Sequence, residues 1–231
     1  MIWGLLRGRM LNPKQQKVIN EVIQYVKELF SDEGSGHDWW HIFRVWQTAA
    51  KIAEVSDVNH YVVQLAALFH DIADWKFHEG DLSAGSKKTC EILTSMKVED
   101  EIISHVCEIV ENISFKGAGE QNGIKTLEGM IVQDADRLDA IGAIGVARAF
   151  AYGGSKNRLL HDPNIKSKTH NSFEEYMNNT SPTINHFYEK LLLLKDRMNT
   201  KIGMEIAIER HKYLECFLKQ FYREWDGEDI S

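Results

Sequence analysis

Apolar residues recur every three or four positions along most of this chain, with polar residues between them. This spacing puts the apolar side chains on one face of a helix, so it predicts a succession of amphipathic α-helices. No clear strand pattern appears anywhere. We therefore expect an all-α protein, with helices over residues 13–30, 39–55, 58–73, 84–96, 99–113, 126–134, 138–152, 182–198 and 201–225.

Several polar and small residues mark where these helices begin, end or meet. Asp38 can cap the helix that starts at Trp39, because an aspartate side chain accepts hydrogen bonds from the first free N–H groups. Gly142 and Gly145 each lower helix propensity by about 1 kcal/mol, so they indicate close helix–helix contact. The glycine pair at 153–154 predicts a helix end. Residues 155–172 lose the pattern and form either an active-site loop or a disordered link.

The helix expected over residues 58–73 is apolar almost all round from Tyr61 to Phe69. A helix of that kind is buried rather than amphipathic. Its end brings His70 and Asp71 into or near the core, where a carboxylate is costly unless it is paired or binds a metal. In a continuing helix, Asp74 would look into the same cavity as both residues. We interpret this segment as half of a metal site.

The other half can come from two further helices. His41 lies in the first turn of the helix that starts at Trp39, and Asp136 ends a later helical segment. Two imidazoles and two carboxylates suit a borderline divalent ion with open positions. The other His-Asp dipeptides have plainer explanations, because Asp38 caps a helix and residues 161–162 lie in the polar link.

Length and charge limit the class of protein. The chain has 231 residues, enough for one large domain or two small ones. We expect one domain over residues 13–225, after an N-terminal extension (1–12) and before a C-terminal tail (226–231). The formal net charge of −7 argues against a general nucleic-acid binder. The apolar start is too short to span a membrane and lacks a signal-peptide pattern.

The three cysteines are Cys90, Cys107 and Cys216. They are widely spaced, odd in number and lie in segments with a helical pattern, so neither a disulfide framework nor a zinc motif is visible. This usage favours a reducing cytoplasm.

The candidate ligands follow the order H…HD…D, and in this the sequence resembles the HD-domain metal-dependent phosphohydrolases. The resemblance implies a helical bundle around a single buried metal site, in which His41, His70, Asp71 and Asp136 bind one divalent metal. Local context is similar to the YpgQ-like nucleotide pyrophosphohydrolases, which cleave nucleoside triphosphates between the α and β phosphates. The similar stretches are residues 36–41, 70–76, 113–117, 133–142, 187–191 and 198–200.

The resemblance and the nearby charges imply further roles. Asp71 and Asp74 are the expected catalytic residues, with Asp74 orienting or deprotonating the attacking water, unless it only supports a metal ligand. Trp75 stands where ppGpp hydrolases of this superfamily carry a second acid, which argues against that substrate. The expected substrate-binding residues are Lys76, Lys116, Arg137 and His105.

Each substrate-binding assignment has a plainer alternative. A solvated lysine would be ordinary at Lys116, although its position and the resemblance favour phosphate binding. His105 is explained equally simply as a core histidine with satisfied hydrogen bonds. Arg137 can instead form a salt bridge to Asp134 or Asp139. His37 is interpreted as structural or as a support for a metal ligand, and its place beside the predicted site also allows a ligand contact.

The resemblance implies an enzyme that hydrolyses nucleoside or deoxynucleoside triphosphates to the monophosphate and pyrophosphate. The resemblance implies Mn²⁺, while the ligand types also allow Fe, Co, Ni, Zn or Mg. A small nucleotide is the expected partner, with no nucleic acid and no membrane, and a homodimer is left open. The alternatives are a nucleoside monophosphate phosphatase, a cyclic-nucleotide phosphodiesterase and a non-catalytic nucleotide-sensing module.

Overall fold

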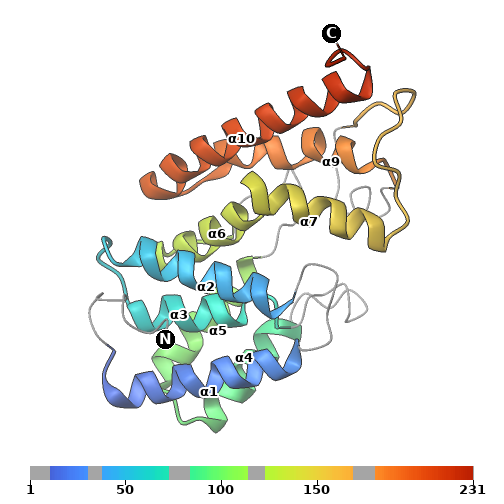
Figure 1. Ribbon diagram of the computed structural model, residues 1–231. Coiled ribbons are helices and arrows are strands. Elements are labelled where there is room, and N and C mark those ends of the chain that lie inside the picture. Colours follow the sequence, from blue (N-terminus) through green and yellow to red (C-terminus); the bar gives the residue numbers. More distant parts are fainter. Residues whose placement is uncertain (1–10, 31–37, 73–83, 114–122, 169–179, 231) are drawn as a thin grey trace. The chain divides into compact units, whose positions relative to one another are not determined.

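The computed structural model describes residues 11–30, 38–72, 84–113, 123–168 and 180–230, and within these ranges every regular element is a helix (Figure 1). The all-α prediction is therefore confirmed. The elements are α1 (Pro13–Leu29), α2 (Trp39–Ala53), α3 (His60–Phe69), α4 (Ala84–Ser95), α5 (Asp100–Ile113), α6 (Leu127–Asp139), α7 (Gly142–Ser155), α9 (Thr183–Glu189), the 3₁₀ turns η2 (Leu191–Leu193) and η3 (Lys195–Arg197), and α10 (Lys201–Trp225).

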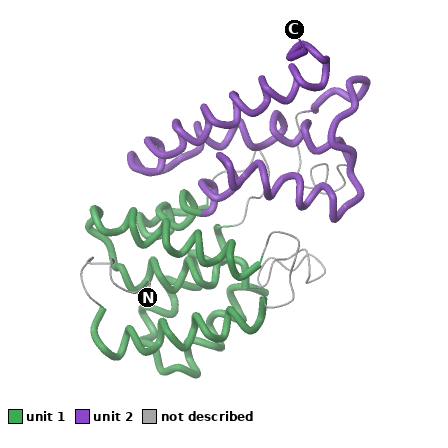
Figure 2. Tube along the Cα trace, in the orientation of Figure 1, with its two compact units in different colours: residues 1–135 green, residues 136–231 purple. Residues whose placement is uncertain are grey.

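The chain divides into two compact units, residues 1–135 and 136–231, and the division falls inside α6 (Figure 2). A single domain over residues 13–225 stays a prediction. None of the described helices is both long and apolar enough to cross a membrane.

Helix α3 is the centre of the first unit. It packs against α1, α2 and α5, while α4 packs against α5. Every residue from Leu65 to Phe69 is fully buried, as the apolar run predicts. Gln64 is the polar interruption in that run, and its side-chain oxygen accepts a hydrogen bond of 3.2 Å from the indole Nε1 of Trp46 on α2. The helix that leads to His70 is thus buried without leaving this amide unsatisfied.

The end of α3 differs from the expected one. The helix stops at Phe69 and not at Ala73. The His70 ring lies 2.8 Å from the carbonyl of Ala67, which is the acceptor that a continuing helix would offer to the Asp71 N–H. The N–H of Ile72 instead bonds the carbonyl of Phe69 at 3.0 Å, in a tighter turn. The first residue after α3, His70, is thus a predicted metal ligand whose ring is bonded to the last turn of the helix.

Two other helices of this unit, α1 and α2, begin at capping residues. Asn12 and Gln15 form a capping box at the start of α1. The Asp38 carboxylate accepts a hydrogen bond of 2.9 Å from the backbone N–H of His41, so the predicted cap of α2 is confirmed. The last turn of α2 ends at Ala53, two residues before the expected end.

Cys90 of α4 and Cys107 of α5 form a disulfide. The expectation that the cysteines form no disulfide is therefore wrong. The two residues come together only because α4 and α5 pack side by side, which their spacing in the sequence does not reveal. The pairing also removes cysteine usage as an argument for a reducing compartment.

In the second unit, α7 packs against α9 and α10. Several expected helix bounds are wrong, including the start of α7, which is Gly142 and not Leu138. Helix α6 runs to Asp139 instead of ending at Asp134, so Asp136 lies within it. The segment expected as one helix over 182–198 is broken at Lys190, whose φ of −141° is not helical, and continues as two 3₁₀ turns. Helix α10 has the predicted bounds, and residues 156–168 form no helix, as the lost pattern predicts.

The glycine pair lies inside α7 instead of ending it. A Cβ atom on Gly153 would lie 2.2 Å from the Thr183 Oγ1 on α9, whereas one on Gly154 would meet nothing within 4 Å. Gly153 therefore permits the close approach of the two helices. Of the two glycines predicted to mark helix contacts, Gly142 lies against the side chain of Arg210 on α10, and Gly145 lies against the backbone of Ala140.

Replacing each glycine of this pair by alanine should separate packing from helix propensity. We expect Gly153→Ala to lower the free energy of unfolding by about 1–3 kcal/mol, because the new methyl overpacks a buried contact. Gly154→Ala is the matched control and should be neutral or stabilising by up to about 1 kcal/mol. Urea unfolding followed by circular dichroism measures both, and equal effects would contradict the packing role of Gly153.

Candidate metal centre

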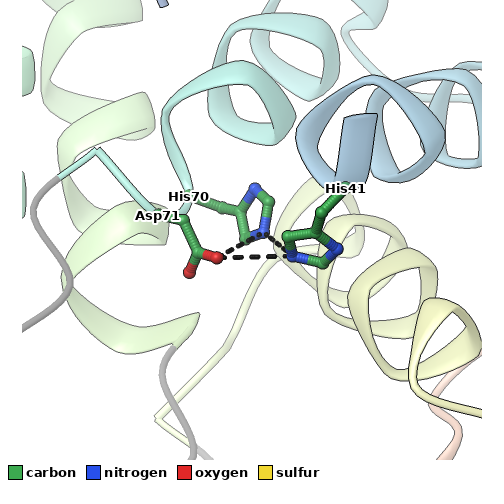
Figure 3. A group of neighbouring side chains, drawn as sticks. All are labelled: His41, His70 and Asp71. Carbon is green, nitrogen blue, oxygen red and sulfur yellow. Dashed lines mark hydrogen bonds and ion pairs between the residues drawn. The ribbon is translucent and has the colours of Figure 1, made fainter. Parts of the chain in front are cut away.

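Three potential ligand atoms converge where α2 begins and α3 ends (Figure 3). The Nε2 atoms of His41 and His70 lie 3.1 Å apart. The Asp71 Oδ2 atom lies 3.3 Å from the His41 Nε2 and 3.6 Å from the His70 Nε2. Among the described residues, these three side chains form the group of histidine and acidic ligands that converges in this way.

These distances fit a shared divalent ion. Metal bonds to nitrogen and oxygen of about 2.0–2.2 Å, at angles between octahedral and tetrahedral, separate neighbouring ligand atoms by about 3.0–3.4 Å. Two of the three observed separations fall in that range, and the third exceeds it slightly. The residues present therefore suit a metal, with positions left over for further ligands.

Hydrogen bonds position the ring of His70 and the helical turn that carries His41. The carbonyl of Ala67 can only accept a hydrogen bond, so the His70 Nδ1 must be the donor. The proton on Nδ1 leaves the Nε2 lone pair of a neutral ring directed at the centre, as in metal-bound histidines. His41 is held by the Asp38 cap of the turn that carries it.

Burial differs sharply among the three side chains. The side chains of His41 and His70 are 1% and 2% exposed, whereas that of Asp71 is 20% exposed. The imidazoles thus lie in the apolar core, and the carboxylate lies at its edge. Solvent reaches the ligand set from the side of Asp71.

The other predicted site residues are placed as follows. Asp136 is half-buried in α6, within the second unit, and its role as a metal ligand stays a prediction. Asp74, Lys76 and Lys116 lie outside the described residues, as does His37.

His105 and Arg137 both have partners. The His105 Nε2 lies 3.1 Å from the Thr126 hydroxyl and 3.9 Å from a Glu128 carboxylate oxygen. Arg137 donates a hydrogen bond to the backbone carbonyl of Arg197. Substrate binding by either residue stays a prediction.

The two other described His-Asp positions have structural roles. Asp38 is the α2 cap, and the His161 ring packs against three aromatic rings near the end of α10, with its centroid 4.9 Å from that of Trp225. The Asp162 carboxylate accepts a hydrogen bond of 2.9 Å from the Asn164 backbone N–H. These contacts agree with the plainer explanations of the two dipeptides.

Two arginines that the sequence analysis did not single out contact the last turn of α6. Arg148 forms an ion pair of 2.9 Å with Asp139, and Arg210 donates a hydrogen bond to the backbone carbonyl of Leu138. Burial lowers the pKa of Arg210, and the nearby Asp139 carboxylate partly offsets that shift. The pairings join residues of separate helices, so no local motif marks them.

A family comparison covers the whole ligand pattern. The model of the HD domain matches residues 39–141. The matched segment contains the three converging side chains and Asp136, in the order of the H…HD…D pattern.

Relatives extend the match to nearly the whole chain. The protein YpgQ of Bacillus subtilis (strain 168) is 35% identical over 219 residues, which are 94% of this chain and 98% of YpgQ. The crystal structure of an HD-superfamily hydrolase from Bacillus thuringiensis is 43% identical, covers 92% of this chain and 98% of its own, and has a TM-score of 0.71. The structure of Bacillus subtilis YpgQ in complex with ADP is 33% identical over 89% of this chain and 97% of its own, with a TM-score of 0.71. The chain therefore belongs to the HD-domain superfamily of hydrolases.

Proposed function

We propose that this protein is a metal-dependent phosphohydrolase that converts nucleoside or deoxynucleoside triphosphates to the monophosphate and pyrophosphate. The convergence of His41, His70 and Asp71, in a chain of the HD superfamily, is the observation that carries the proposal. The ADP complex of the related YpgQ supports a nucleotide as the ligand. The cleavage position follows from the resemblance to nucleotide pyrophosphohydrolases.

In this proposal, Asp136 is the fourth metal ligand. Its support is its place as the last acid of the H…HD…D pattern, inside the segment that the HD-domain family matches. Two imidazoles and two carboxylates suit Mn²⁺, and also Fe, Co, Ni, Zn or Mg. When bound, such an ion offsets the charge of phosphate oxygens and lowers the pKa of water.

The proposed reaction is the attack of water on the α phosphorus. A new P–O bond forms to the water oxygen, and the bond from the α phosphorus to the bridging oxygen of the β phosphate breaks. Asp74 accepts the proton that the water loses, which is the work of a general base. The leaving group is pyrophosphate, and the added oxygen stays on the monophosphate.

Charge neutralisation completes the proposed site. Phosphoryl transfer depends mainly on positioning and on offsetting negative charge. We assign that role to Lys76, Lys116 and Arg137, and a phosphate contact to His105. All four assignments rest on the resemblance and on residue type.

The products of a nucleotide panel test the reaction directly. Metal-stripped protein reloaded with Mn²⁺ should release one pyrophosphate per monophosphate from triphosphates, as measured by chromatography with parallel pyrophosphate and phosphate assays. Phosphate released from monophosphates would instead identify a phosphatase. Nucleotide binding without turnover, with metal demonstrably bound, would identify a sensing module.

Removal of the Asp71 carboxylate should abolish metal binding and activity together. We expect Asp71→Ala to weaken Mn²⁺ binding by more than about 100-fold, because loss of a residue that only hydrogen-bonds to a metal ligand already lowers metal affinity by about 10–100-fold. Asp162→Ala is the matched control, because it removes the acid of another His-Asp dipeptide that packs elsewhere. Metal content by emission spectroscopy and turnover by product assay measure the outcome. Metal retained by Asp71→Ala would contradict the assignment.

Substitution of Asp74 should separate chemistry from metal binding. We expect Asp74→Asn to bind Mn²⁺ normally but to lose about 10²–10⁴-fold in kcat, the usual contribution of a general base. Mn²⁺ titration and steady-state kinetics on the same preparation measure both. Full activity of Asp74→Asn would exclude Asp74 from the mechanism. Loss of Mn²⁺ binding in this variant would instead indicate that Asp74 supports a metal ligand.

A further inference from the structure

Two arginines from different helices hold the last turn of α6, all within the second unit. The Arg148 Nη1 on α7 lies 2.9 Å from the Asp139 Oδ2, and their side chains are only 19% and 5% exposed. Arg210 on α10 donates to the carbonyl of Leu138, the neighbouring residue. The last turn of α6 is thus held at two points, the Asp139 side chain and the Leu138 backbone carbonyl.

The link between α6 and α7 accommodates this arrangement. Gly142 has a φ of +75°, and a Cβ atom there would lie 3.0 Å from the Cγ of Arg210. The N–H of Ile141 bonds the carbonyl of Leu138 at 3.3 Å, so that carbonyl accepts from both the link and Arg210. A glycine at position 142 leaves room for the arginine stem across the end of the helix.

The two arginines are better suited to fixing the geometry of the α6 turn than to raising the stability of the fold. Burial lowers the pKa of Arg210, because desolvation disfavours the charged guanidinium, and the Asp139 carboxylate opposes that shift. Buried ion pairs often contribute little net stability, because desolvation opposes the attraction between the charges. A guanidinium nevertheless fixes direction well, since its donors form a rigid planar fork.

We propose that Arg148 and Arg210 are positioning residues that set the direction of the Asp136 carboxylate for metal binding. Asp136 lies three residues before Asp139, on the same side of α6, and two residues before Leu138. Fixing the Asp139 carboxylate and the Leu138 carbonyl fixes the rotation of the turn that carries Asp136. This inference rests on the proposed function, in which Asp136 is the fourth ligand.

A double-mutant cycle tests whether Arg210 acts through Asp136. Mn²⁺ dissociation constants would be measured by electron paramagnetic resonance for the wild type, Arg210→Gln, Asp136→Asn and the double variant. We expect Arg210→Gln to weaken Mn²⁺ binding by about 10–100-fold, as substitutions of residues that support metal ligands usually do. In the Asp136→Asn background, the same substitution should have no further effect. Arg223→Gln, an exposed arginine change on the same helix, is the matched control and should leave the affinity unchanged.

The readouts separate positioning from a purely structural role. An unchanged Mn²⁺ affinity in Arg210→Gln, or an equal loss in both backgrounds, would overturn the inference even if the variant melts at a lower temperature. If circular dichroism shows that Arg210→Gln does not fold, the same cycle is measured with Arg148→Gln in its place. Arg148→Lys should then bind Mn²⁺ more tightly than Arg148→Gln but more weakly than the wild type, because lysine lacks the planar fork of donors. Turnover by Arg210→Gln should return at saturating Mn²⁺ with an unchanged KM for nucleotide.

The cycle also distinguishes this inference from the proposed function. Wild type that binds Mn²⁺ and hydrolyses nucleotide, with affinity dependent on Asp136 but not on either arginine, overturns the inference alone. If Asp136→Asn binds Mn²⁺ as the wild type does, both the inference and the fourth ligand are wrong, while the other three ligands stand. Wild type without Mn²⁺ binding overturns the proposed function and the inference together.

Discussion

The hydrogen bond between the His70 ring and the carbonyl of Ala67 joins the fold to the candidate metal centre. It ties the first residue after α3 to a carbonyl in the last turn of that helix. The same bond settles which ring nitrogen carries the proton and turns the other toward His41 and Asp71. One contact therefore fastens a potential ligand to the end of a buried helix, and a substitution that shifts this end of α3 also shifts the ring.

That contact depends on the burial of α3. Helices α1, α2 and α5 surround it, and the run from Leu65 to Phe69 has no solvent exposure. A helix so enclosed has little freedom to shift along its axis, because close-packed side chains resist small displacements. His70 thus follows directly on a closely packed helix of the first unit. Such rigidity suits a site whose ligand atoms must stay within a few tenths of an ångström of one another.

The sequence predicted those features that depend on local pattern. Periodic apolar residues located most helices, Asp38 marked a true cap, and the histidine and aspartate that follow Phe69 marked three converging side chains. The errors lie where contacts distant in the sequence decide the outcome. Gly153 lies within a helix because Thr183 packs against it, and Cys90 meets Cys107 because two helices lie side by side. The partners of Asp139 were equally hidden, since Arg148 belongs to another helix.

The unequal burial of the ligand set has a kinetic consequence for a metal held there. The two imidazoles are closed off by the core, whereas the Asp71 carboxylate is partly open to solvent. An ion held by these three side chains would therefore meet a chelator or a competing ion on the side of Asp71, at the positions that the three ligands leave over. Exchange of the ion on that side would need no opening of the helical core.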